Sequence, residues 1–276
     1  MPVSNQQLAA FADTHAWRIP FDTSPRHLAG PGDARHVTHG LAAAGWRRTS
    51  EPFSPTLVLT DPDQRYNLHF DPQSAASSWW QLQATSTDTE PGWYASFGEL
   101  VPAEILASVT DILIAPKPAE ERDPLRTLHS ANWTTDTANT AHSPDGACHL
   151  EHHVVDGHGT SWSIEVCEPG HSTPWGRHLW RAHFGSRTPV HLVGAFVAAL
   201  ADTAPLQRGM HDRTAHYSTV QQPSQLTPQQ VVAAHASRLD VIRAQARAAR
   251  RQQQTPTTAQ APVTSPAARP TARRRS

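Results

Sequence analysis

Histidine, glutamate and cysteine side chains gather in one stretch of the sequence and are the first candidates for chemistry. Eight of the 18 histidines lie between His149 and His191. Around them, the segments 148–155 and 161–167 alternate apolar and polar residues, as half-buried antiparallel strands do. One register of these strands buries the apolar residues at even positions, which are Leu150, Val154, Trp162, Ile164 and Val166. The opposite face then carries His149, Glu151, His153, Glu165 and Cys167.

Imidazole, carboxylate and thiolate are the side chains that hold zinc in proteins, so this face is a candidate metal site. The spacing argues against it, because the chain offers neither an H-x-x-x-H helix nor a C-x-x-C pair. Strand alternation alone would produce such a polar set on a solvated face. We therefore expect no metal, no other cofactor and no catalytic residue here. A small hydrolase or metal-dependent enzyme that uses this face stays the alternative function.

The two cysteines are too few for a disulfide framework. Strand parity places Cys148 on the buried face and Cys167 on the opposite one, which predicts two reduced thiols and no bond between them. A nucleophile motif of the form G-x-S-x-G is absent. The Gly30-Pro-Gly-Asp33 stretch lacks the pattern of a phosphate loop and is more typical of a turn that caps a helix.

Arginine is concentrated at the end of the chain. Residues 221–276 hold nine Arg and one Asp, a net charge of +8. Removing these from the totals of 23 basic and 24 acidic residues leaves 14 and 23 in residues 1–220, a net charge of −9. An acidic body with a basic tail predicts contact with something anionic, either an unknown protein partner or non-specific nucleic acid. The arginines expected to make that contact are Arg243, Arg247, Arg250, Arg251, Arg273, Arg274 and Arg275.

A helix is expected to carry the first four of these arginines. Thr227-Pro228-Gln229-Gln230 is a capping box, and the pattern after it predicts a helix to about Gln253. Its apolar seam consists of Val231, His235, Leu239, Ile242, Ala246 and Ala249, and we expect Arg243, Arg247, Arg250 and Arg251 on the opposite side. The seam leaves a second possibility open, in which the helix docks on the body or on another copy of the chain.

The body that must position these residues is duplicated. The pattern W-x3-F-G-x3-P begins at Trp93 and again at Trp180, 87 residues later. Trp46 and Trp133 are also 87 residues apart, and so are Gly45 and Asn132, which suit the left-handed backbone at a helix end. These matches predict two equivalent units with Trp46, Phe97, Trp133 and Phe184 in the core.

Each unit is expected to open with a helix, continue with antiparallel strands and close with a second helix. The predicted strands are 56–60, 66–70, 79–84 and 93–97 in the first unit and 148–155, 161–167 and 179–184 in the second, which therefore lacks one strand. Asp33, Asp123 and Thr188 are the expected helix N-caps. The fold class is α+β, with two tandem α-β(3–4)-α repeats, a C-terminal helix and a disordered tail.

These elements divide the chain into seven segments. They are an N-terminal arm at 1–25, a first repeat at 26–116, a linker at 117–122, a second repeat at 123–208, a linker at 209–226, a basic helix at 227–253 and a disordered tail at 254–276.

Three stretches carry a family resemblance. His27–Asp33, Pro91–Gly98 and Leu179–Phe184, the last followed by Thr188–Leu192, resemble an uncharacterised domain family of streptomycetes and related actinobacteria, usually present in two copies per chain. The resemblance covers about residues 25–208. It implies a bacterial cytoplasmic protein but no activity, ligand or catalytic residue. Since no apolar stretch of 18 residues occurs, we expect no membrane contact. The sequence thus favours a non-enzymatic interaction protein, an adaptor, whose basic tail contacts an anionic partner.

Overall fold

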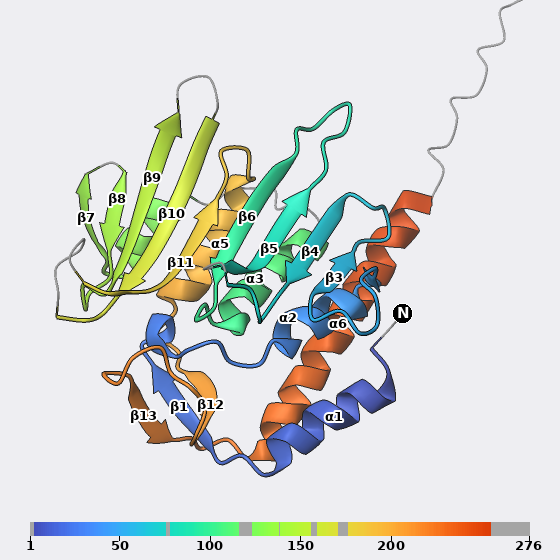
Figure 1. Cartoon of the computed structure of the whole chain (residues 1–276), viewed down its shortest axis with the longest axis horizontal. Helices are drawn as coiled ribbons and strands as arrows, with labels where there is room; N and C mark the ends of the chain where they lie inside the picture. Colours follow the sequence, from blue (N-terminus) through green and yellow to red (C-terminus); the bar gives the residue numbers. More distant parts are fainter. Residues whose placement is uncertain are drawn as a thin grey trace, which may run out of the picture.

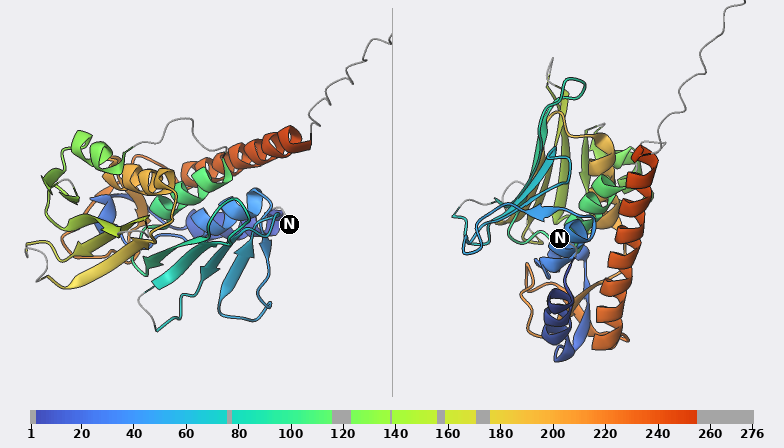
Figure 2. Two further views of the ribbon diagram at one scale, coloured as in Figure 1. Left: turned by 90° about the horizontal axis from the view of Figure 1, so that it is seen from above. Right: turned by 90° about the vertical axis from the view of Figure 1, so that its right-hand side faces the viewer.

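A computed structural model describes residues 3–75, 78–115, 123–137, 139–155, 159–170 and 176–254 of the chain. Among these residues, ten strands form one antiparallel sheet in the order β2-β3-β4-β5-β6-β11-β10-β9-β8-β7 (Figure 1). Helices lie on one face of this sheet and leave its other face open (Figure 2). The fold is α+β, as the pattern of the sequence predicts. None of the described helices has the length and hydrophobicity that a membrane span requires.

The first half of the sheet comes from repeat 1. Its elements are α2 (Arg35–Ala43), β2 (Arg47–Arg48), β3 (Leu57–Thr60), β4 (Tyr66–Phe70), β5 (Ser78–Ala84), β6 (Trp93–Gly98) and α3 (Ala103–Ile114). Repeat 2 supplies α4 (Pro124–Ser130), β7 (Thr134–Thr137), β8 (Thr140–His142), β9 (Cys148–Val155), β10 (Gly159–Cys167), β11 (His178–Phe184) and α5 (Val190–Ala201). The expectation that repeat 2 lacks a strand is wrong, because the short strands β7 and β8 were too polar to be recognised.

The two repeats meet edge to edge at β6 and β11. Ser96 pairs with His183, its equivalent 87 residues later, and Phe97 pairs with Ala182 just as Ala95 pairs with Phe184. This register is what a two-fold axis between Ser96 and His183 would produce. The helices α3 and α5 that cover the junction are related by the same axis. The Ser108 hydroxyl of α3 donates to the carbonyl of Ala195 of α5, its equivalent 87 residues later, at 3.1 Å.

The predicted core residues Trp46, Trp133, Phe97 and Phe184 are all buried. Gly45 and Asn132 both have positive φ values, 98° and 63°, so two different residues serve one backbone geometry, as predicted. In each repeat the following tryptophan donates its backbone N–H to the helix, Trp46 to Leu41 and Trp133 to Leu128. The duplication is therefore visible down to single hydrogen bonds.

The helix caps follow the sequence only in part. Asp123 caps α4 as expected, with its side chain accepting from the backbone N–H of Leu125. Helix α2 begins one residue later than expected, with Ala34 at the N-cap, although the Asp33 carboxylate still accepts from the backbone N–H of Arg35. For α5 the N-cap is Pro189 and not Thr188, whose hydroxyl instead donates to the carbonyl of Tyr94 in repeat 1.

A second, small sheet joins distant parts of the chain. The strand β1 (Pro20–Ser24) lies between β12 (Leu206–Gly209) and β13 (Val220–Pro223). The segment 1–25 is therefore more than an irregular arm, and 209–226 is more than a linker. The strand β1 follows α1 (Asn5–Ala16), and a single 3-10 turn, η1 (Arg26–Leu28), connects β1 to repeat 1. The expected boundaries of the segments stay predictions, and the linker 117–122 lies outside the described residues.

Helix α6 (Pro228–Gln254) crosses the back of the molecule and packs on α1, α2 and α3 (Figures 1 and 2). The predicted capping box is present, since Thr227 and Gln230 each accept from the other's backbone N–H. His235, Leu239, Ile242 and Ala246 of the apolar seam are buried. The seam thus docks on the body of the same chain. The expected disordered tail lies, from residue 255 on, outside the described residues.

Candidate functional site

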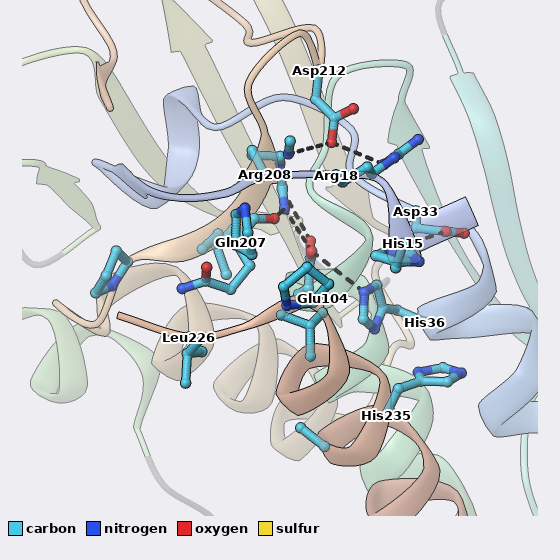
Figure 3. A pocket seen from close by; sticks show the side chains of 18 of the residues that line it. His15, Arg18, Asp33, His36, Glu104, Gln207, Arg208, Asp212, Leu226 and His235 are labelled. Atoms are coloured by element: carbon cyan, nitrogen blue, oxygen red, sulfur yellow. Dashed lines mark hydrogen bonds and ion pairs between the residues drawn. The ribbon is translucent and has the colours of Figure 1, made fainter. Parts of the chain in front are cut away.

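A cavity of about 350 Å³ lies where α1, the start of α3, the small sheet and the first third of α6 meet (Figure 3). Its walls come from segments far apart in the sequence. They include His15 and Arg18, Gly32 and Asp33, His36, Glu104, the stretch Pro205–Gly209, Asp212, and the α6 residues Val231, Ala234, His235 and Arg238. The cavity therefore exists only when the N-terminal segment, repeat 1 and α6 are assembled.

A buried ion pair forms one side of the cavity. Arg208, whose side chain is 1% exposed, donates to both carboxylate oxygens of Glu104, at 2.6 and 3.0 Å. It also donates to the carbonyls of Ala29 and Gly30. Burial alone would raise the pKa of Glu104, but the charge of Arg208 holds it below its ordinary value. Glu104 is thus fixed as a carboxylate with its partner already in place.

The imidazoles of His15, His36 and His235 line another side of the cavity, and Phe11 and His39 pack against them. Phe11 stacks on His15 on one side and on His235 on the other, with ring centroids 4.1 and 4.0 Å apart. The Nε2 atom of His235 lies 3.2 Å from Nδ1 of His39. Burial lowers the pKa of His36, and it lowers the pKa of His39 to about 4 and that of His235 to about 3. All three imidazoles are therefore neutral near pH 7.

The cavity combines apolar side chains with histidines and paired charges, a lining that suits the binding of a ligand. His36 Nε2 lies 3.7 Å from Glu104 Oε1, a neutral imidazole beside a fixed carboxylate. None of the lining residues in the described part of the chain is a serine, threonine, cysteine or lysine. The hydroxyl, thiol and amine nucleophiles of covalent catalysis are therefore not among these lining residues. The sequence pattern did not reveal this site, since Glu104 and Arg208 lie 104 residues apart and His235 looked like one more position of an apolar seam.

The histidine-rich face predicted for repeat 2 is present but is an ion-paired surface. Glu165 pairs with Arg181, and its other oxygen lies 3.6 Å from His178. Glu151 lies 3.9 Å from His149 and 3.5 Å from His153. Over the described ranges, no group of three or more His, Cys, Asp or Glu side chains has a geometry that could hold a metal ion. This face gives no support to the metal-dependent alternative.

Two positions in that hairpin differ from strict alternation. Cys167 is fully buried, although an exposed position was expected, because the register between β10 and β11 shifts between Val166 and Cys167. Val154, expected inside, is 65% exposed at the free end of the hairpin. Cys148 is buried as expected, and both thiols are free. Burial raises the pKa of each thiol, so neither is an activated nucleophile.

Four of the seven predicted arginines belong to the described residues, and all four lie on α6. Arg247 and Arg251 are exposed on α6, and Arg243 donates to Asp240 on the same helix at 2.8 Å. Arg250 was expected on the side opposite the seam, but it does not lie there. Its guanidinium donates to the carbonyl of Ala44 at 2.8 Å and so closes the end of α2. Arg273, Arg274 and Arg275 lie outside the described residues.

Two segments match one family model. Residues 60–119 and 142–206 match SPDY, described as a domain of unknown function, DUF317. The first segment contains β4, β5, β6 and α3 and the second contains β9, β10, β11 and α5, so the chain is similar to this uncharacterised domain in two equivalent places. No curated protein and no solved structure matches the chain.

Proposed function

We propose that the protein is a non-enzymatic interaction protein, an adaptor, whose helix α6 and following tail contact an anionic partner. The single observation that supports this proposal most directly is the docking of α6. Its seam is buried against α1, α2 and α3, so the helix is held in place with Arg247 and Arg251 directed outward. The tail beyond it adds Arg269 and Arg273–Arg275.

Arginines on a helix of fixed position suit contacts with phosphate groups. Such contacts depend on positive charge within range of the phosphates and do not require recognition of the bases. The partner we propose is nucleic acid bound without sequence preference. The acidic remainder of the chain, with a net charge of −9, would oppose such binding and keep it weak at physiological salt. The resemblance to an actinobacterial family and the cytoplasmic setting that it implies fit this proposal.

The test is duplex binding by the full chain over a salt series. With four or five phosphates contacted, we expect log K to fall against log salt with a slope of about −4. Replacing Arg243, Arg247 and Arg251 by Gln should make the slope shallower by about 2 to 3. Fluorescence anisotropy of a labelled duplex measures both values.

A matched control removes the same charge elsewhere. Arg126, Arg177 and Arg187 are exposed in repeat 2, whereas α6 packs mainly on α1, α2 and α3, so their replacement by Gln gives the same net charge at a distance from α6. This variant should keep the slope of the parent chain. An equal change in both triple variants would mean that net charge alone matters, and no binding at low salt would reject the nucleic-acid partner.

A further inference from the structure

We propose that the cavity between α1, α3, the small sheet and α6 binds a small, uncharged and mainly apolar molecule that carries one hydrogen-bond donor. The volume of about 350 Å³ is within the range of about 300–1,000 Å³ that ligand sites occupy. This site is separate from the outward arginines of α6, and the inference does not depend on their having a partner.

The charges around the cavity argue for an uncharged ligand. Each charged residue of the wall is already paired inside the protein. The pairs are Arg18 with Asp212 at 3.0 Å, Arg26 with Asp202 at 2.8 Å, Asp33 with Arg35 at 2.7 Å, Glu104 with Arg208 at 2.6 Å and Arg238 with Asp111 at 2.6 Å. A charged ligand would have to break one of these pairs and leave a partly buried charge unmatched, which is costly.

Part of the remaining wall is apolar. Leu206 of β12 is buried on one side, and Val231 of α6 is half-buried on the other. Leu226, just before α6, keeps 42% of its surface exposed although it lines the cavity (Figure 3). An apolar ligand between Leu226 and Val231 would remove this surface from water, which supplies the driving force for binding.

Two buried polar atoms of residues in the wall, Oε1 of Gln207 and Nδ1 of His235, have no hydrogen-bond partner among the residues that the structure describes, and only the first of them is an acceptor whatever the tautomer. The Gln207 side chain donates from Nε2 to the Asp22 carboxylate at 2.5 Å, which fixes the orientation of the amide. Its Oε1 atom is buried and accepts no hydrogen bond from any residue that the structure describes. A buried acceptor without a donor is unfavourable, so a ligand N–H or O–H placed there would be recognised. This acceptor is the observation from which we infer the donor group of the ligand.

The probe for this site is N-phenyl-1-naphthylamine, a neutral fluorescent molecule with one N–H group. We expect saturable binding to the full chain with a Kd on the order of 10–200 µM, as expected for a molecule of this size. Val231→Trp would fill the cavity and lower the affinity by more than about tenfold. Val241→Trp is the matched control, since Val241 lies on the outer side of the same helix and is 54% exposed. It should bind the probe as the parent chain does.

A second comparison tests the hydrogen bond. Gln207→Leu should weaken binding of N-phenyl-1-naphthylamine by about threefold to tenfold. It should change the binding of 1-phenylnaphthalene, which has no N–H, by less than about twofold. Circular dichroism of each variant confirms that it is folded. Absence of saturable binding, or equal binding by the Val231 and Val241 variants, would overturn the proposed site. Equal weakening of both probes by Gln207→Leu would overturn the donor requirement.

Discussion

The imidazoles of His39 and His235 meet in the interface between α2 and α6, where Phe11 of α1 also packs. Both residues are about 95% buried, with exposed fractions of 5% and 4%. Burial lowers the pKa of each, and the nearby positive charges add to this, from Arg35 for His39 and from Arg238 for His235. Asp33 acts in the opposite direction on both but does not reverse the effect. The folded chain thus requires these rings to be neutral.

We predict that this requirement makes stability depend on pH. In the unfolded chain each histidine titrates near its ordinary pKa of about 6.5, so between about pH 6.5 and 4 the unfolded state binds more protons. Above pH 6.5 the two rings contribute no pH dependence, and below it the free energy of unfolding falls. The loss should be on the order of 2 kcal/mol per ring at pH 5. Urea unfolding from pH 7.5 to 4.5 measures it.

The double variant His39→Leu and His235→Leu should show a shallower pH dependence than the parent chain. His211→Gln is the control, because His211 is exposed and outside this cluster. The same slope in the double variant and the control would show that other groups govern the acid sensitivity.

At the scale of elements, the end of α2 depends on a residue of α6. Gly45 has a φ of 98°, where a side chain is strained, and a Cβ there would collide with the Arg250 guanidinium. Arg250 is bonded to the Ala44 carbonyl one residue before. At the equivalent turn of repeat 2, Asn132 has a φ of 63°, whereas α6 packs mainly on α1, α2 and α3. The two turns share one backbone geometry but differ in their surroundings.

We therefore predict different outcomes at these two equivalent positions. Gly45→Ala should cost about 1–3 kcal/mol, from backbone strain together with displacement of Arg250. Asn132→Gly should lie within about 0.5 kcal/mol of the parent chain, because glycine adopts this conformation without strain. Urea unfolding measures both free energies. In an Arg250→Ala background the cost of Gly45→Ala should fall toward the strain alone, and an unchanged cost would exclude the steric contribution.

Features that were predictable from sequence are those that neighbouring residues determine. The capping box at Thr227, the left-handed turns at Gly45 and Asn132, and the strand alternation around Trp162 are local, and the structure has them. The pairing of β1 with β12 and β13 is not local, since Pro20 pairs with Gly209, and neither segment has a strong strand pattern. The cavity was not predicted for the same reason, because its walls come from segments that lie far apart in the sequence.

At the scale of the whole molecule, the two repeats behave as one body because their sheets are continuous. The junction is the pairing of β6 with β11, and directly beneath it Phe97 and Phe184 meet edge to face, with centroids 5.4 Å apart and planes at 85°. Phe196 of α5 packs against both rings. A core shared in this way does not divide into two independent halves, which predicts one cooperative unfolding transition.

Phe97→Ala and Phe184→Ala test this prediction because they are equivalent substitutions in different repeats. Each should cost about 3–5 kcal/mol, since a fully buried aromatic ring leaves a cavity. The double variant should lose less than the sum, by about 0.5–1.5 kcal/mol, because the first substitution already removes the edge-to-face pair. Hydrogen exchange should show that either single substitution weakens protection in β4 and in β10 alike. Loss of protection confined to the substituted repeat, or two separate transitions in urea followed by tryptophan fluorescence and circular dichroism, would mean that the repeats fold as separate units despite their continuous sheet.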